Sequence, residues 1–151
     1  MDIYTIILSL HNLLRWVVVI LAVLALARAF LGWFGGREWT ERDRKIGSFF
    51  SASLDTQLLL GLILYFFLSP LTRTALQDFG AAMGNPGLRF FALEHFFYML
   101  LAVFLVHVGS VLSRRGKTDA DKHRRAALLY SLAVIIILIA IPWSRPLIRL
   151  G

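Results

Sequence analysis

The sequence predicts an all-α integral membrane protein, a four-helix bundle that forms a single transmembrane domain over residues 1–151. Hydrophobic residues make up 58% of the chain, which is more than a soluble domain of this size can bury. Four apolar stretches each reach the roughly 20 residues that cross a bilayer core of about 30 Å. We place the spans approximately at residues 8–34, 49–68, 88–112 and 126–143.

Basic residues are concentrated in two of the connections between these spans, and they determine the predicted orientation. The positive-inside rule places both connections in the cytoplasm, so both termini are expected outside, on the periplasmic face of a bacterial inner membrane. Arg145 and Arg149, near the C-terminus, run against this rule. The net charge of +7 then reflects topology, and we expect no nucleic-acid partner. The basic residues of the two connections are Arg37, Arg42, Arg44 and Lys45, and Arg114, Arg115, Lys117, Lys122, Arg124 and Arg125.

The first span lies within a longer apolar stretch that begins at Ile3. Its extra turns are expected in the outer membrane interface, and the glycines at 35 and 36 are expected to end the helix. Residues 25–27 have the small-residue pattern of a signal-peptide cleavage site. No Lys or Arg precedes the apolar stretch, however, and Arg15 interrupts it, so we interpret the segment as an uncleaved helix.

The remaining spans are bounded by turn and cap signals. Thr40, three residues before Asp43, is expected to cap a short interfacial helix that leads into the second span. Ser69 and Pro70 end that span, because proline stops a helix. In residues 71–87, apolar residues at near-helical spacing predict a short amphipathic helix over the outer end of the bundle. The fourth span is expected to end at Pro142 and Trp143, with the indole at the membrane interface.

Ionisable residues inside a membrane span are costly and usually face the bundle interior, so each is a candidate functional residue. By depth they fall into an outer and an inner layer. The chain has no cysteine, which excludes disulfides, thiolate-held iron–sulfur clusters and a c-type haem attachment. Any metal must therefore be held by nitrogen or oxygen. The candidates are His11, Arg15, Asp55, Arg89, Glu94, His95 and His107.

His11 and His95 are the candidate metal ligands, because they lie on different spans at the same predicted depth near the outer surface. A b-type haem held by two histidines across a helix bundle needs this arrangement. Arg15, one turn below His11, is the candidate partner of a haem propionate, and Arg89 at the outer rim is the alternative partner. His95 and His107 cannot share a metal, because twelve residues of helix separate them by about 18 Å.

Structural interpretations of the same residues stay open. Either histidine alone is compatible with a simple hydrogen-bonded contact between helices, and Arg15 with Glu94 is compatible with an ion pair that joins the first and third spans. We expect Asp55 and His107 to form a buried hydrogen-bonded pair near the inner surface. We interpret His123, among the basic residues of the second cytoplasmic connection, as a solvated loop residue.

Four motifs carry a resemblance to a known family: HNLLRW at 11–16, QLLLGLILYF at 57–66, RFFALEH at 89–95 and IPW at 141–143. In this order they resemble the small bacterial four-helix membrane proteins that are commonly labelled cytochrome b-like, over nearly the whole chain. The resemblance implies a b-type haem protein or an accessory membrane subunit of an electron-transfer chain. The family pattern admits a histidine where this chain has Asp55, so the resemblance does not support an inner-layer haem here.

We therefore predict a membrane electron carrier, rather than a stand-alone enzyme, with one haem b near the outer face. Its expected partners are the lipid bilayer, a quinol or quinone, and a redox protein or larger redox complex. The alternative is a cofactor-free accessory subunit of a respiratory or photosynthetic complex, in which the polar residues only fix helix packing. A transporter is less favoured, because no span is broken by internal glycine and proline near the midplane.

Overall fold

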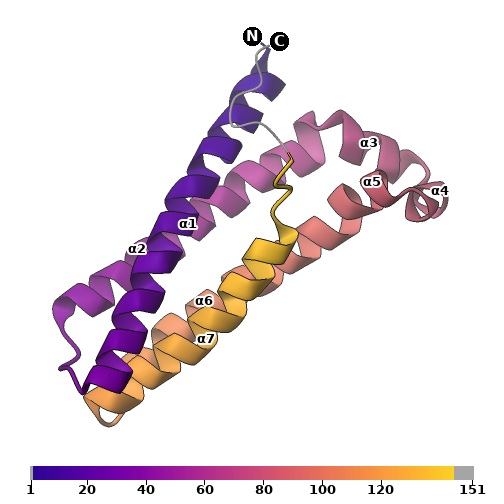
Figure 1. The fold of residues 1–151 in the computed structure, drawn as a ribbon. Helices are drawn as coiled ribbons and strands as arrows, with labels where there is room; N and C mark the ends of the chain where they lie inside the picture. The colour runs from indigo at the N-terminus through magenta and orange to yellow at the C-terminus, as the bar shows by residue number, and fades with distance from the viewer. Residues whose placement is uncertain (1, 145–151) are drawn as a thin grey trace.

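The structure, a computed structural model, describes residues 2–144, and these form helices without any strand. Four helical segments are long and apolar enough to cross a membrane, which is compatible with the predicted four-helix membrane bundle (Figure 1). The first is α1 (Ile3–Gly35), and the second is α2 (Glu41–Ile63) continued by η1 (Leu64–Leu68). The third consists of α5 (Pro86–Arg89), η2 (Phe90–Glu94) and α6 (His95–Arg114), and the fourth is α7 (Asp119–Ala140).

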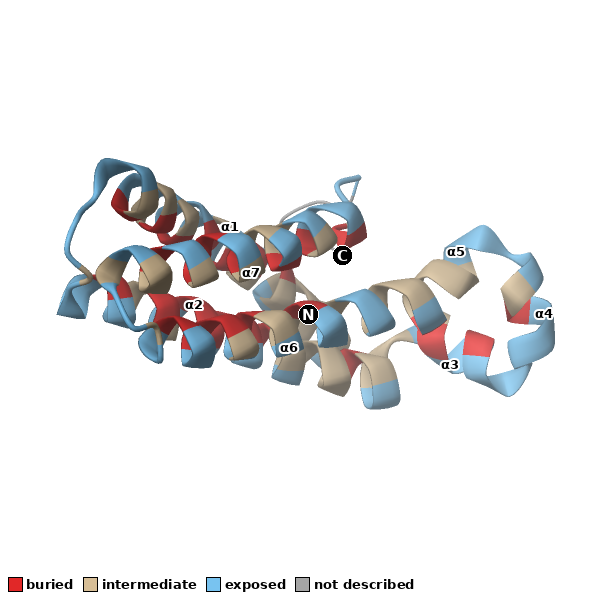
Figure 2. Ribbon diagram, turned by 90° about the horizontal axis from the view of Figure 1, so that it is seen from below, coloured by how far each residue is buried: buried red, intermediate tan, exposed pale blue. Residues whose placement is uncertain are grey.

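Each long helix packs against two others, so the bundle is a ring in the order α1, α2, α6, α7. The inward faces are rich in small residues, which let helix backbones approach closely in a membrane protein. The outward faces carry large apolar side chains, which are compatible with lipid contact. Figure 2 shows the buried residues on the sides of the helices that face one another. The core includes Val18, Ala22, Ala25, Ala29, Phe50, Leu54, Ala102, Val106, Ala126, Ala127, Tyr130 and Ala133.

At one end of the bundle, which we call the basic end, the connections carry the basic residues of the sequence. The helix α1 ends at Gly35, and Gly36 adopts the left-handed conformation (φ 60°), as the glycine pair predicts. The Asp43 carboxylate accepts hydrogen bonds from the backbone nitrogen of Thr40 at 2.8 Å and from its hydroxyl at 2.6 Å. This cap confirms the predicted start of α2, which then continues into the apolar segment without a break.

His123 also lies at the basic end, and the prediction of a solvated loop residue is wrong. Its residue is only 1% exposed, because α7 already begins at Asp119 and places position 123 on the helix face that meets α1. The ring packs against Gly32, where an added Cβ would lie 2.2 Å from Cε1. The Trp39 ring covers it at a centroid distance of 4.9 Å. The basic charges around it in sequence did not reveal this packing.

At the opposite end, the connection between the second and third long segments forms α3 (Pro70–Gln77) and α4 (Phe79–Gly84) and leads into α5. We call this the α3–α5 end (Figure 1). A helix was predicted here, and Pro70 occupies its first turn, where a missing N–H costs nothing. The helix α3 packs against both η1 and η2. Residues 141–143 of the predicted fourth span follow the end of α7, and Arg145 and Arg149 lie outside the described residues.

Candidate functional site

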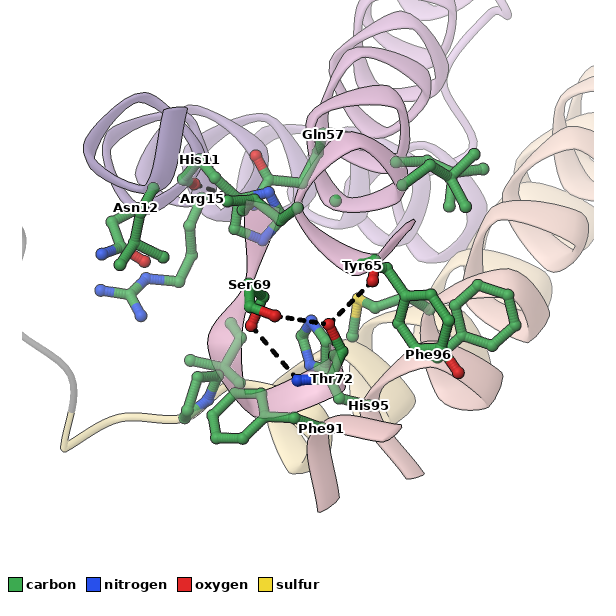
Figure 3. A pocket seen from close by; sticks show the side chains of 18 of the residues that line it. His11, Asn12, Arg15, Gln57, Tyr65, Ser69, Thr72, Phe91, His95 and Phe96 are labelled. Atoms are coloured by element: carbon green, nitrogen blue, oxygen red, sulfur yellow. Dashed lines mark hydrogen bonds between the residues drawn. The ribbon is translucent and has the colours of Figure 1, made fainter. Parts of the chain in front are cut away.

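A cavity of about 130 Å³ lies among the long helices toward the α3–α5 end. Its wall is mostly apolar, with a few polar side chains directed inward, which is the usual character of a small-molecule or cofactor site. Figure 3 shows His11, Arg15, Gln57 and His95 around it. The volume is close to that of an engineered apolar cavity of about 150 Å³ that takes a benzene-sized ligand. The wall also includes Asn12, Val18, Leu54, Leu58, Gly61, Leu62, Tyr65, Thr72, Phe91, Met99, Ile137 and Ile141.

His11 and His95 both line this cavity and lie close together. This agrees with the prediction that they share one depth in the membrane. The centroids of the two imidazole rings are 6.4 Å apart, and the ring planes are inclined by 71°. The two residues come from different helices, α1 and α6. The structure therefore confirms that the sequence places these histidines side by side, while their role as metal ligands stays a prediction.

The His95 ring is oriented by α7, because its Nδ1 lies 2.8 Å from the carbonyl oxygen of Ala140. A carbonyl only accepts, so Nδ1 carries the proton, and the neutral imidazole keeps the lone pair of Nε2 available. The His11 ring is held against α2. An added Cβ at Gly61 would lie 3.3 Å from its Cε1, so the absence of a side chain at 61 makes room for the imidazole.

The distance between the ring centroids is compatible with two imidazole ligands of one metal. With metal–nitrogen bonds of about 2 Å and each ring centre roughly 1 Å behind its nitrogen, two imidazoles on opposite sides of one metal would have centroids about 6 Å apart. The observed 6.4 Å is close to this value. Within residues 2–144 no group of three or more His, Asp or Glu side chains is arranged to hold a metal ion. A metal at His11 and His95 would therefore need further ligands other than His, Asp or Glu side chains of the described residues.

Arg15 adds a positive charge to the cavity wall, and its guanidinium carbon lies 5.7 Å from the centroid of the Trp16 ring. The residue is only 7% exposed, and within the described part of the chain its buried Nε and Nη1 atoms have no hydrogen-bond partner. Gln57 uses its Nε2 to donate to the carbonyl oxygen of His11 at 2.9 Å. Buried guanidinium nitrogens without acceptors are costly, so the Nε and Nη1 of Arg15 favour a ligand that brings an anionic acceptor.

Arg89, the alternative propionate partner, lies outside the cavity wall. Its Nε donates to the Glu94 carboxylate at 2.7 Å, and its Nη1 donates to the carbonyl oxygen of Met83 at 3.3 Å. The alternative ion pair between Arg15 and Glu94 is therefore wrong, because Glu94 pairs with Arg89. The η2 segment explains this, since a π-helix brings residues five apart onto the same side.

Two short π-helical segments, η1 and η2, border the cavity, and sequence analysis missed both. The Tyr65 hydroxyl in η1 donates to the carbonyl oxygen of Ala92 in η2 at 2.7 Å, and the Thr72 hydroxyl of α3 donates to the carbonyl oxygen of Tyr65 at 2.8 Å. These bonds join the two segments and α3 over the cavity. π-helical turns often occur at functional sites. Pro70, two residues after the end of η1, signals where the helix stops.

Asp55 and His107 meet on α2 and α6, with 3.4 Å between Oδ2 and Nε2. The predicted contact is confirmed, but the prediction that the pair is buried is wrong. Their side chains are 51% and 48% exposed, because the seam between α2 and α6 turns both of them toward the outside of the bundle. They do not line the cavity.

No protein-family model, curated protein or solved structure matches this chain. The resemblance to cytochrome b-like proteins therefore stays a prediction that depends on the four motifs. Three of these motifs contribute to the cavity wall, through His11 and Arg15, Gln57 and Gly61, and Phe91 and His95. The fourth provides Ile141 and Pro142.

Proposed function

We propose that the chain is a membrane-bound electron carrier that holds one b-type haem between His11 and His95. The observation that carries this proposal is the pair of imidazole rings from two helices, 6.4 Å apart across one cavity. When bound, the haem supplies one-electron chemistry between its ferrous and ferric states. The chain supplies two imidazole ligands, a positive charge and an apolar wall.

Four polar residues of the wall have defined tasks in this proposal. His11 and His95 would hold the iron of the haem, and the Ala140 carbonyl fixes the tautomer and orientation of His95. Arg15 pairs with a propionate and thereby satisfies its buried guanidinium. The side chain of Gln57 holds the backbone of α1 at His11. Apolar residues exclude water from the iron and so set its reduction potential.

A haem is larger than the cavity, so its edges must displace side chains of the wall. Met99 is a candidate for this movement, because its unbranched, flexible side chain repacks at low cost. The apolar outer faces next to the cavity provide an approach for a quinol from the bilayer.

In the predicted orientation, the basic end lies in the cytoplasm and the haem lies near the periplasmic face of a bacterial inner membrane. Electrons would then be exchanged with a quinol or a redox protein at that face. A cofactor-free packing subunit is less favoured. It leaves the buried Nε and Nη1 of Arg15 without acceptors within the described residues, and buried unpaired donors cost about 1–3 kcal/mol each.

The test is a reduced-minus-oxidised visible spectrum of detergent-purified protein, expressed with added haem precursor. Wild type is expected to show a low-spin haem b spectrum, and His11→Ala and His95→Ala are each expected to lose it. His107→Ala is the matched control, because it removes a histidine outside the cavity, and it should keep the spectrum. Wild-type protein that binds no haem even when haem is supplied in excess would refute the proposal.

A further inference from the structure

The exposed pair of Asp55 and His107 is unusual because both residues lie within helices that are apolar enough to cross a membrane. Around them the outward surface of α2 and α6 is apolar, with Leu59 and Phe104 exposed. Ionisable groups at such positions are costly against lipid, and they normally face a protein or a water-filled cavity. In a bilayer, this face therefore needs a covering partner.

The hydrogen bonds of His107 show how polar this pair is. Its Nδ1 lies 3.0 Å from the carbonyl oxygen of Val103, and because a carbonyl only accepts, Nδ1 must donate. The Nε2 of His107 lies 3.4 Å from Oδ2 of Asp55, which is an ion-pair distance when the imidazole is charged. His107 engages only one oxygen of Asp55, Oδ2, whereas a carboxyl group accepts several hydrogen bonds. The pair therefore has capacity for a donor from outside the chain.

We propose that a second copy of this chain covers the α2–α6 seam, as a two-fold symmetric dimer. The patch contains one acid and one base side by side, so it is complementary to itself. A two-fold axis through the patch brings Asp55 of each copy to His107 of the other, which is the pairing that an isologous interface requires. Ala52, exposed one turn before Asp55 on α2, permits close approach of the two helices.

The absence of cysteine from the sequence makes single-cysteine crosslinking a clean test. Leu59→Cys places a thiol on the α2–α6 seam, and Ile135→Cys places one on an exposed position of α7, on the other side of the ring. In vesicles of the purified protein, the first variant is expected to form a crosslinked dimer and the second is not. Equal crosslinking of both variants, or none from Leu59→Cys, would overturn the proposal.

A second measurement tests the polar pair itself. Single-molecule photobleaching of tagged protein in vesicles gives the dimer fraction as the protein is diluted. Asp55→Asn and His107→Ala are each expected to weaken dimerisation at least tenfold. Tyr98→Phe removes a polar group from the opposite side of α6 and should leave dimerisation unchanged.

Wild type that stays monomeric at every dilution, or variants that dimerise as strongly as wild type, would contradict a dimer held by these residues. Helix content and a monodisperse elution profile show whether each variant is folded. If both variants fail to fold, the crosslinking of Leu59→Cys and Ile135→Cys in the otherwise native chain still decides the question.

Discussion

His95 on α6 is hydrogen-bonded to the backbone of Ala140 at the end of α7, with 2.8 Å between Nδ1 and the carbonyl oxygen. This carbonyl is available because α7 ends at Ala140, ahead of Pro142. In a continued helix, the N–H of residue 142 would donate to the carbonyl oxygen of Leu138, but Pro142 has no N–H. The indole of Trp143 donates to the Leu138 carbonyl oxygen instead, at 3.0 Å. The motif at 141–143 thus leaves the Ala140 carbonyl free to accept from His95, and it supplies a donor for the Leu138 carbonyl.

Pro142→Ala is expected to weaken haem binding about 10–100-fold, the usual effect of losing a group that orients a metal ligand. Without the proline, the helix can continue past Ala140. The backbone N–H four residues later, at position 144, would then compete with His95 for the Ala140 carbonyl oxygen. Titration of the purified apoprotein with haem measures the affinity. Pro86→Ala is the control, since Pro86 begins α5, away from His95. Equal affinities for the two variants and wild type would show that this bond does not orient the ligand.

Arg15→Leu is expected to keep the haem but to lower its midpoint potential, on the order of tens of millivolts. Loss of a buried positive charge favours the ferric state, because that state carries one more positive charge. Spectroelectrochemical titration gives the potential. Arg89→Leu serves as the comparison, because Arg89 is paired with Glu94 outside the cavity wall. A larger shift from Arg89→Leu than from Arg15→Leu would identify Arg89 as the propionate partner.

Gly32→Ala is expected to destabilise the protein by about 1–3 kcal/mol, the usual cost of overpacking. The added Cβ would lie 2.2 Å from the buried His123 ring, so the packing of α7 on α1 must change. Thermal unfolding in detergent, followed by circular dichroism, measures the effect.

Gly35→Ala is the control for the general benefit of alanine in a helix, since its Cβ meets only Arg37, at 3.6 Å. In the double variant Gly32→Ala with His123→Ala, part of the loss should be recovered, because the clash is removed. A Gly32→Ala variant as stable as wild type would mean that α1 and α7 are less tightly packed than the structure shows.

Reporter fusions test the predicted orientation in the membrane. A reporter after Gly116 should be retained in the cytoplasm, because six basic residues flank this connection between the third and fourth long helices. A reporter after Asn85, in the α3–α5 connection, should be exported. An exported Gly116 fusion, or a retained Asn85 fusion, would contradict both the orientation and the proposed periplasmic position of the haem.

The sequence by itself determined the helical class, the four apolar segments and the neighbouring positions of His11 and His95. The number of apolar stretches long enough to cross a bilayer gives the number of spans. Because successive spans run in alternating directions, the rise per residue gives the depth of each residue, and it places His11 and His95 at the same depth. Residues that act on the backbone next to them, such as helix caps and helix-ending residues, were equally informative. The glycine at 36, the Thr40 cap and the proline at 70 act on their own backbone, and each has the predicted effect.

Only the tertiary structure decided which way each side chain faces. His123 and Asp55 show this in opposite directions, since the residue expected in solvent is buried and the residue expected in the interior is exposed. The rotation of a helix about its axis depends on packing against its neighbours, and its own apolar pattern is too uniform in a membrane span to reveal it. The π-helical turns shift this rotation further, so the pairing of Glu94 with Arg89 instead of Arg15 could be seen only in the folded chain.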